Sequence, residues 1–361
     1  GANVSLLLRE RGITKPLLVA GERTKNVFFA RTGMRLPVFD AFHPNPDLQD
    51  CVAGAALYQE KGCDGLISIG GGSAMDTAKG IKALLMTDIA HVRANQLPPE
   101  GKVPHLAIPG TAGTGAETTA VAVLYEDGQK LSVDHPALLP DGVLLDGSLL
   151  DTLPEYHRKS CAMDALAQGI ESWWAKKATP GSRIHAERAI RGVLDNLTAY
   201  LQGDRKAQDE MLHAAYESGV AILTTRTTAA HAMSYQITKK LGAAHGHACM
   251  LTLPHLWAHL AAQAEYQPML TELAHILGGE KPMDGAVLLR GLLAVLELDK
   301  IPMPDDATLD MLAASVNPER LGNHPEALTT AQLRAIYVQA FTPMTDTERA
   351  EAIAAWEQYG K

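Results

Sequence analysis

The sequence predicts an α/β domain followed by an all-helical domain. Up to Pro154, short apolar runs alternate with helical stretches, which is typical of a parallel sheet with crossover helices. Beyond Pro154, apolar side chains recur at every third or fourth position, the spacing of amphipathic helices. We therefore expect two domains, an α/β domain at 1–154 and a helical domain at 155–361.

The N-terminal half contains apolar segments of strand length that are bounded by turn residues. The expected strands are 16–20, 37–42, 65–69, 104–109 and 143–145. A β-hairpin is expected over 121–133, because Asp127-Gly128 supplies the positive φ angles of a tight turn. Helices are expected from near Asp47, a candidate N-cap, to near Gly62, and over 74–85.

The C-terminal half has helical periodicity. One apolar stripe consists of Met163, Leu166, Ile170 and Trp173. Further helices are expected at 184–201, 210–224 and 287–298. Two capping boxes, Thr329 with Gln332 and Thr345 with Glu348, predict the starts of two late helices. No strand is expected after Pro154.

Composition and charge argue against several classes of protein. The 361 residues include 32 Lys+Arg and 41 Asp+Glu, and the resulting net charge of −9 disfavours general nucleic-acid binding. No apolar run approaches the ~18 residues that cross a bilayer, and no secretory signal is visible. The four cysteines form no CxxC pair, so neither a disulfide framework nor a cysteine zinc site is indicated. We expect a soluble cytoplasmic protein with no nucleic-acid or membrane partner.

Two glycine-rich loops each follow an expected strand. In the first, Gly70-Gly71-Gly72-Ser73 opens a helix, whose N-terminal N–H groups favour an anion such as a pyrophosphate. The second, from Pro109 to Glu117, adds small residues and hydroxyl groups. Either loop alone is equally well explained as a tight strand-to-helix turn. Because loops at the carboxyl ends of strands meet at the ligand crevice of an open α/β sheet, the pair predicts a nucleotide site.

The residues after the first strand bear on the choice of nucleotide. A carboxylate that binds the adenosine ribose is expected there, but the sequence has Gly21. Arg23 and Lys25 are positioned to meet a 2′-phosphate, and the alternative is that they are ordinary solvated charges. The expected cofactor is therefore NADH or NADPH.

Polar residues in an apolar context suggest a metal site in the helical half. Asp164 and Gln168 lie four residues apart, so they share one helix face. Asp164 with His231 and His245 offers one carboxylate and two imidazoles, a set that suits Fe²⁺ or Zn²⁺ and leaves a position open. Gln168 could supply a neutral amide oxygen, which is a weak ligand for such metals. The alternative is that both histidines are hydrogen-bonded core residues.

Four segments, in this order, resemble the iron-containing (group III) alcohol dehydrogenase family over nearly the whole chain. They are the run from Gly70 to Lys79, the run from Thr111 to Glu117, Met163-Asp164-Ala165-Leu166 and the His231/His245 pair. The resemblance implies the dehydroquinate synthase-like fold of that family, with an NAD(P)-binding α/β domain, a helical domain, and the metal and substrate between them. It also implies an NAD(P)-linked, metal-dependent alcohol dehydrogenase or aldehyde reductase.

The resemblance assigns cofactor contacts to particular side chains. The set consists of Gly71, Gly72, Ser73, Asp76, Thr111, Thr114 and Lys130. The glycines and the serine would hold the pyrophosphate, the threonines would line the nicotinamide side, and the lysine would lie near the ribose.

The resemblance also defines a metal set, from which this chain departs. The family pattern is one Asp and three His, with the first His one helical turn after the Asp. Gln168 occupies that position here. The expected ligands are Asp164, Gln168, His231 and His245, with Fe²⁺ as the first choice and Zn²⁺ as the second.

Two further segments, 226–235 and 135–141, resemble the phosphonoacetaldehyde reductase (2-hydroxyethylphosphonate dehydrogenase) branch of the family. Arg226, five residues before His231, carries a planar guanidinium suited to a phosphonate; its alternative role is a structural salt bridge. His247 is the expected proton donor to the product alkoxide, and its alternative is a structural place in the core. We expect a small anionic aldehyde as substrate and a homodimer.

Other functions use related scaffolds. Sulfoacetaldehyde would present nearly the same anionic group to Arg226, and maleylacetate reductases and glycerol dehydrogenases share the fold. A lyase like 3-dehydroquinate synthase is a rival that expects more basic residues around a phosphorylated sugar. A metal-free binding protein is a third reading, suggested by Gln168.

Overall fold

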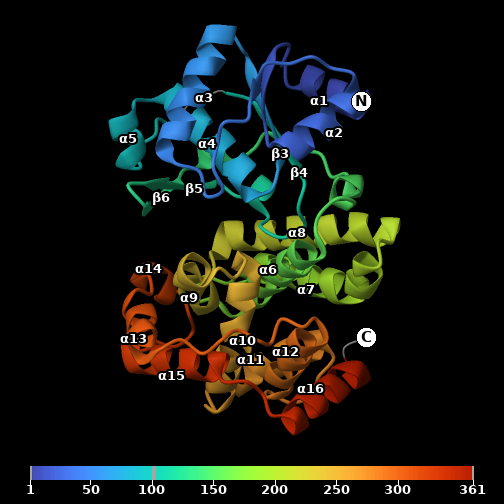
Figure 1. The fold of residues 1–361 in the computed structure, drawn as a ribbon, viewed down its shortest axis with the longest axis vertical. Helices are drawn as coiled ribbons and strands as arrows, with labels where there is room; N and C mark the ends of the chain where they lie inside the picture. Colours follow the sequence, from blue (N-terminus) through green and yellow to red (C-terminus); the bar gives the residue numbers. More distant parts are fainter. Residues whose placement is uncertain (1, 100–102, 360–361) are drawn as a thin grey trace. The chain divides into compact units, whose positions relative to one another are not determined.

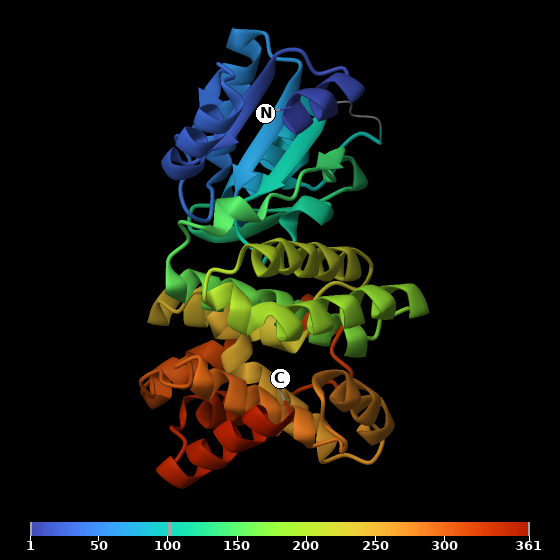
Figure 2. The same ribbon diagram turned by 90° about the vertical axis from the view of Figure 1, so that its right-hand side faces the viewer.

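The chain forms two compact units, Gly1–Leu153 and Pro154–Lys361. A computed structural model describes residues 2–99 and 103–359. Figure 1 shows the two units, and Figure 2 shows the strands of the first unit lying side by side. The expected boundary lies one residue later than the one observed.

The first unit is built on a five-stranded parallel sheet with the order β2-β1-β3-β4-β7. The strands are β1 (Pro16–Ala20), β2 (Val38–Phe39), β3 (Gly65–Gly70), β4 (His105–Pro109) and β7 (Gly142–Val143). The three central strands are buried along their whole length, which explains their continuous apolar composition. The α/β fold class predicted for this half is confirmed.

Alternate residues of β1 enter two separate cores. Leu17 and Val19 pack with α3 (Leu48–Lys61) and α4 (Gly72–Met86). Their neighbours in the strand pack with α1 (Ala2–Glu10) and α2 (Glu22–Thr32) on the other face.

Smaller elements complete the α/β unit. They are α5 (Ile89–Arg93), η1 (Ala116–Thr118), η2 (Pro136–Leu138), η3 (Gly147–Leu150) and the hairpin β5 (Val121–Glu126) with β6 (Gln129–Asp134). The hairpin turns at Asp127, with φ 49°, and Gly128, with φ 71°, as the Asp-Gly sequence predicts. Asp47 caps α3, since its carboxylate accepts the backbone N–H of Gln49 at 2.9 Å.

The second unit contains helices only, over the residues that the structure describes. Its elements are α6 (Glu155–Trp174), α7 (Pro180–Leu201), α8 (Arg205–Thr225), α9 (Ala229–Gln236), the π-helical turn η4 (Ile237–Leu241), α10 (His245–Ala261), α11 (Gln267–Leu277), α12 (Asp284–Val295), α13 (Asp306–Ala314), α14 (Pro318–Leu321), α15 (Thr330–Phe341) and α16 (Asp346–Tyr359). Within residues 2–99 and 103–359, no helix is long and apolar enough to cross a membrane.

Helices α6 and α10 pack closely where the polar residues of the helical unit gather. Gly246, in the first turn of α10, makes this approach possible, because a Cβ there would lie 2.7 Å from the Cβ of Asp164. Both helices are buried on almost all sides in this region. Polar side chains on them therefore need partners, because an unpaired buried polar group is costly.

Candidate functional site

The two glycine-rich loops of the α/β unit lie side by side. The backbone N–H of Gly110 donates to the carbonyl of Gly70 at 2.7 Å, and Gly70 has a φ of 151°, which favours glycine. A Cβ at Gly71 would lie 3.2 Å from the methyl carbon of Thr111, and one at Gly72 would lie 3.4 Å from that of Thr114. The small residues thus allow the loops to touch.

The first loop places the beginning of α4 beside the second loop. Gly71 is the N-cap and contributes no capping side chain, so the first N–H groups of this 15-residue helix have no side-chain acceptor from the cap. Gly72 and Ser73 are the first helical residues and are partly exposed. Such a terminus favours an anion, as the sequence predicts for a pyrophosphate.

Helix α4 carries two charged side chains that lie close together, since Lys79 Nζ is 3.9 Å from Asp76 Oδ1. Burial raises the pKa of Asp76 to about 6, although the charges of Lys79 and Lys130 oppose the shift. Lys79 is fully buried and donates to the Thr119 hydroxyl at 3.1 Å and to the Val121 carbonyl at 2.9 Å. The charge of Lys130 therefore acts on the Asp76 carboxylate, which links two of the predicted cofactor residues electrostatically.

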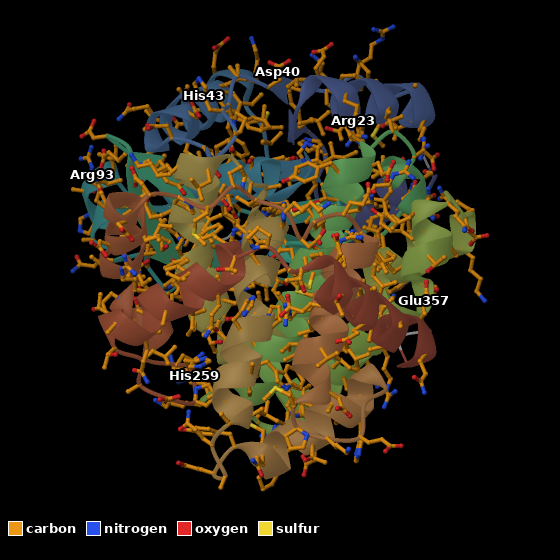
Figure 3. All side chains as sticks on the ribbon, turned by 60° about the horizontal axis from the view of Figure 1, so that its bottom comes forward. Arg23, Asp40, His43, Arg93, His259 and Glu357 are labelled. Carbon is orange, nitrogen blue, oxygen red and sulfur yellow. The ribbon has the colours of Figure 1, made fainter. Side chains whose placement is uncertain are left out.

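The residues expected to meet a 2′-phosphate have other partners. Arg23 donates to the Thr152 hydroxyl at 2.6 Å, and the Lys25 ammonium lies 2.7 Å from the carboxylate of Asp40. Asp40 immediately follows β2, next to β1, and Figure 3 labels it together with Arg23. The sequence predicts an acid after the first strand and therefore does not single out Asp40, which falls inside the strand expected at 37–42. Only the shorter observed strand, Val38–Phe39, puts this carboxylate at a strand end.

In the helical unit, four potential metal ligands converge. The ligand atoms of Asp164, His231, His245 and Cys249 all lie within 4.8 Å of one another. Asp164 Oδ1 is 3.2 Å from His231 Nε2 and 3.9 Å from His245 Nε2. Asp164 and His231 are buried, whereas the side chain of His245 is 37% exposed, so the cluster is open on the side of His245. The three ligands that the sequence predicted at these positions do come together.

A buried carboxylate orients His231. Glu171 contacts His231 Nδ1 through one oxygen, and its other oxygen accepts the N–H of Ala230 at 2.8 Å and the hydroxyl of Thr228 at 2.7 Å. Burial raises the pKa of Glu171, but the charge of His231 and these hydrogen bonds lower it overall. The contact fixes the ring so that Nε2 points to Asp164, the arrangement in which a second carboxylate supports a metal-ligating histidine.

Gln168 lies at the cluster but its amide is engaged. Its Nε2 donates to Asp164 Oδ1 at 3.3 Å, and its Oε1 accepts the Ser218 hydroxyl at 2.8 Å. The oxygen expected to ligate a metal therefore bonds to α8, and the amide N–H holds the Asp164 carboxylate. In this geometry Gln168 supports a ligand, and its own ligation stays a prediction.

The donor chemistry of the cluster fits a divalent ion. Although burial opposes both shifts, the neighbouring histidines lower the pKa of Asp164, and the charges of Cys249 and Asp164 raise the pKa of His245 to about 9. Donor atoms around a tetrahedral zinc would lie about 3.3–3.6 Å apart. Three of the donor pairs, at 3.2, 3.9 and 3.9 Å, lie near that range, and all four donor atoms lie within 4.8 Å of one another.

Arg226 ends α8 in a conformation that is rare for a residue with a side chain. Its φ is 63° and its ψ is 177°, a region that favours glycine and costs other residues about 1–3 kcal/mol. Asn323 holds the loop on both sides, since its amide donates to the carbonyls of Thr225 at 2.8 Å and Thr227 at 3.1 Å. The guanidinium is partly buried and donates to the Leu223 carbonyl at 3.4 Å.

His247 is held by protein groups at both ring nitrogens. Its Nε2 lies 2.8 Å from the carbonyl of Leu298, to which it donates, and its Nδ1 lies 3.1 Å from the hydroxyl of Tyr156. Burial lowers the pKa of His247. This geometry supports the structural alternative over the proton donor that the sequence analysis expected.

The fold and these two clusters define a class of protein, in which an α/β unit with paired glycine-rich loops precedes a helical unit with buried metal-ligating side chains. Two family models make the class specific. The model of the iron-containing alcohol dehydrogenase matches residues 2–147, and that of the C-terminal part of the Fe-containing alcohol dehydrogenase family matches residues 159–341. The chain belongs to the iron-containing alcohol dehydrogenase family, as its resemblance predicted.

Individual relatives are similar over different shares of the chain. The phosphonoacetaldehyde reductase of Streptomyces viridochromogenes is 36% identical over 230 residues, which cover 59% of this chain and 58% of that protein. The NAD-dependent methanol dehydrogenase of Bacillus methanolicus is 30% identical over 290 residues, 75% of each protein. The sulfoacetaldehyde reductase of Bifidobacterium kashiwanohense, solved with NAD⁺, superposes with a TM-score of 0.86 at 25% identity, over 94% of both chains. In three curated relatives the matched part spans 63%, 60% and 58% of the relative's length.

Proposed function

We propose that this protein reduces phosphonoacetaldehyde to 2-hydroxyethylphosphonate with NAD(P)H. The observation that carries the proposal is Arg226, whose loop is fixed at both ends and lies five residues before His231. A guanidinium is a planar donor that suits a phosphonate. A relative that shares 36% identity is a phosphonoacetaldehyde reductase, which supports the same substrate.

The paired glycine-rich loops are the proposed cofactor site. The N-terminus of α4 receives the pyrophosphate, and the hydroxyls of Thr111 and Thr114 lie beside it. NADH is the better supported nucleotide, because Arg23 bonds to Thr152 and the Lys25 ammonium is neutralised by Asp40, a carboxylate whose second oxygen offers an acceptor for the ribose. The NAD⁺ in the structure of the sulfoacetaldehyde reductase agrees with this choice.

Asp164, His231 and His245 are the proposed ligands of a divalent ion. Such an ion, when bound, supplies a Lewis acid that polarises a carbonyl oxygen. Glu171 keeps His231 in the tautomer that presents Nε2, and the Gln168 amide holds the Asp164 carboxylate in place. The exposed edge of His245 leaves one side of the cluster accessible to a small molecule.

The reaction balances as a two-electron reduction. A hydride leaves the nicotinamide and forms a C–H bond at the carbonyl carbon, while one proton from solvent forms the O–H bond. NAD(P)⁺ and the alcohol are the products. Arg226 contributes by binding the anionic end of the aldehyde, which fixes the other end for hydride transfer.

Two substitutions at Arg226 separate its charge from its backbone. Arg226→Ala removes the guanidinium and leaves a strained φ, whereas Arg226→Gly removes the guanidinium and relieves the strain. We expect both variants to lose at least about tenfold in kcat/KM for phosphonoacetaldehyde, because a charge-assisted contact is worth about 1.5–3 kcal/mol. Both should keep most of their activity on uncharged propanal, as should the control Arg191→Ala on the exposed side of α7. Equal losses for the two aldehydes would make Arg226 structural.

Sulfoacetaldehyde is a second candidate substrate, favoured by the likeness to the sulfoacetaldehyde reductase. Its sulfonate carries one negative charge, whereas a phosphonate approaches two near neutral pH. The ratio of kcat/KM for the two aldehydes at pH 8 decides between them. A preference for sulfoacetaldehyde would replace the proposed substrate and keep the proposed site.

A further inference from the structure

The cluster of potential ligands includes a cysteine, which is absent from the family pattern of one Asp and three His. We propose that Cys249 is the fourth protein ligand of the metal ion, and that its thiolate shifts the site towards zinc. This inference rests on the metal site assigned under the proposed function and adds a residue to it.

The position of Cys249 supports ligation. It lies on α10 one turn after His245, so both side chains leave the same face of the helix. Its Sγ is 3.9 Å from His245 Nε2, and the sulfur belongs to the group of four ligand atoms that lie within 4.8 Å of one another. The residue is fully buried and forms no disulfide. A sulfur and a nitrogen bound to one tetrahedral zinc would lie about 3.6 Å apart, so the pair of Cys249 and His245 is already close to that spacing.

The second line of support is the missing ligand on α6. The family pattern places a histidine one turn after Asp164, where this chain has Gln168. The Gln168 oxygen is taken by Ser218 and its nitrogen by Asp164, so α6 offers one donor to the cluster. Helix α10 offers two donor groups, the imidazole of His245 and the thiol of Cys249. The thiol on α10 thus takes the place of the ligand that is absent from α6.

The change of donor alters which metal the site prefers. Thiolates are soft ligands that favour zinc, whereas a set of one carboxylate and three imidazoles suits iron equally well. Binding releases the thiol proton, because sulfur ligates as the thiolate. The expected order of metals from the sequence, iron before zinc, is therefore reversed by the thiol.

Cobalt reports directly on sulfur ligation. The full-length protein is stripped of metal, loaded with one equivalent of Co²⁺ without oxygen, and its absorption is recorded. A cobalt–thiolate bond produces an intense charge-transfer band in the near ultraviolet, which oxygen and nitrogen ligands do not. We expect this band in the native sequence and its loss in Cys249→Ser. The control Cys63→Ser, which removes a partly exposed thiol from the α/β unit, should keep the band.

Affinity and selectivity complete the test. Chelator competition should show at least about a hundredfold loss of zinc affinity in Cys249→Ser, since loss of an outer-shell partner alone costs about 10–100-fold. The double variant Cys249→Ser/Gln168→His should recover affinity without the band. Its ratio of bound zinc to bound iron, at equal free concentrations, should fall at least about tenfold from that of the native protein.

The outcomes separate this inference from the proposed function. Stoichiometric cobalt binding without a near-ultraviolet thiolate band in the native protein overturns ligation by Cys249 and leaves the metal site intact. Failure to bind any divalent ion overturns both. If Cys249→Ser does not fold, the absorption spectrum of the cobalt-loaded native protein alone decides whether a thiolate binds the metal.

Discussion

Glu171 is the residue on which the orientation of His231 depends. We expect Glu171→Gln to weaken zinc binding about 10–100-fold, because an amide is a poorer partner for the His231 N–H than a carboxylate. Chelator competition measures the change, and Glu210→Gln on the exposed side of α8 is the matched control. Unchanged affinity in Glu171→Gln would mean that the backbone, and not Glu171, fixes the imidazole.

Glu117, in η1, makes a separate prediction about pH. It is 2% exposed, one of its oxygens has no hydrogen-bond partner, and burial raises its pKa from 4.5 to about 7. Because the folded-state pKa lies above the unfolded value, protonated Glu117 stabilises the fold below pH 4.5, and this stabilisation is lost as the pH rises through 7.

In the native protein, the free energy of unfolding should therefore fall between about pH 5 and pH 7.5 as Glu117 ionises, and Glu117→Gln should reduce this fall. Denaturant unfolding at a series of pH values measures it, with Glu10→Gln on exposed α1 as the control. A slope that is identical in the native protein and in Glu117→Gln would show that Glu117 is ionised at neutral pH without cost.

Among single residues, the sequence predicts those whose chemistry is unusual for their surroundings. Asp164, His231 and His245 are polar residues in apolar surroundings, the resemblance to the family marked them as ligands, and they lie together. Cys249 was missed, since one cysteine in an apolar helix is indistinguishable from a small core residue. The engagement of Gln168 with Ser218 was also beyond prediction, because the two residues belong to different helices.

At the scale of elements, the glycine turn before α4 makes the clearest prediction. We expect Gly71→Val to weaken NADH binding at least about tenfold, because its side chain would press on Thr111 and keep the pyrophosphate from the helix N-terminus. Titration of NADH fluorescence measures the affinity, and circular dichroism checks that the fold is retained. Gly181→Val, in the exposed first turn of α7, is the control. Equal affinity in both variants would remove the nucleotide from this loop.

Strands and long helices follow from local pattern, whereas their exact ends depend on packing. The strand expected at 37–42 is reduced to Val38–Phe39, since only these residues pair with β1. Three local predictions are confirmed. Asp47 caps α3, Thr329 caps α15, and Asp127-Gly128 has the positive φ angles of a tight hairpin turn. The π-helical turn after α9 had no sequence signal, because it depends on the way α9 and α10 are joined.

Over the whole molecule, the chain divides between Leu153 and Pro154, next to the position where the periodicity of the sequence changes. Each unit has its own cluster, with the glycine-rich loops in one and the metal-ligating residues in the other. The fold class and the family are therefore accessible from the sequence. The homodimer and the cytoplasmic location stay predictions, because surface complementarity and cellular address leave no such periodic signal.

The proposed reaction is metal-dependent hydride transfer to an anionic aldehyde, and isotope transfer from the cofactor to the product tests it. NADH fully deuterated at nicotinamide C4 is incubated with phosphonoacetaldehyde and either zinc-loaded or metal-stripped protein, and the product is analysed by mass spectrometry. We predict 2-hydroxyethylphosphonate with one carbon-bound deuterium for each NADH consumed by the loaded protein, and at least about a hundredfold slower turnover by the stripped protein. Product without deuterium would contradict hydride transfer from NADH, and equal rates with and without metal would contradict the role of the metal.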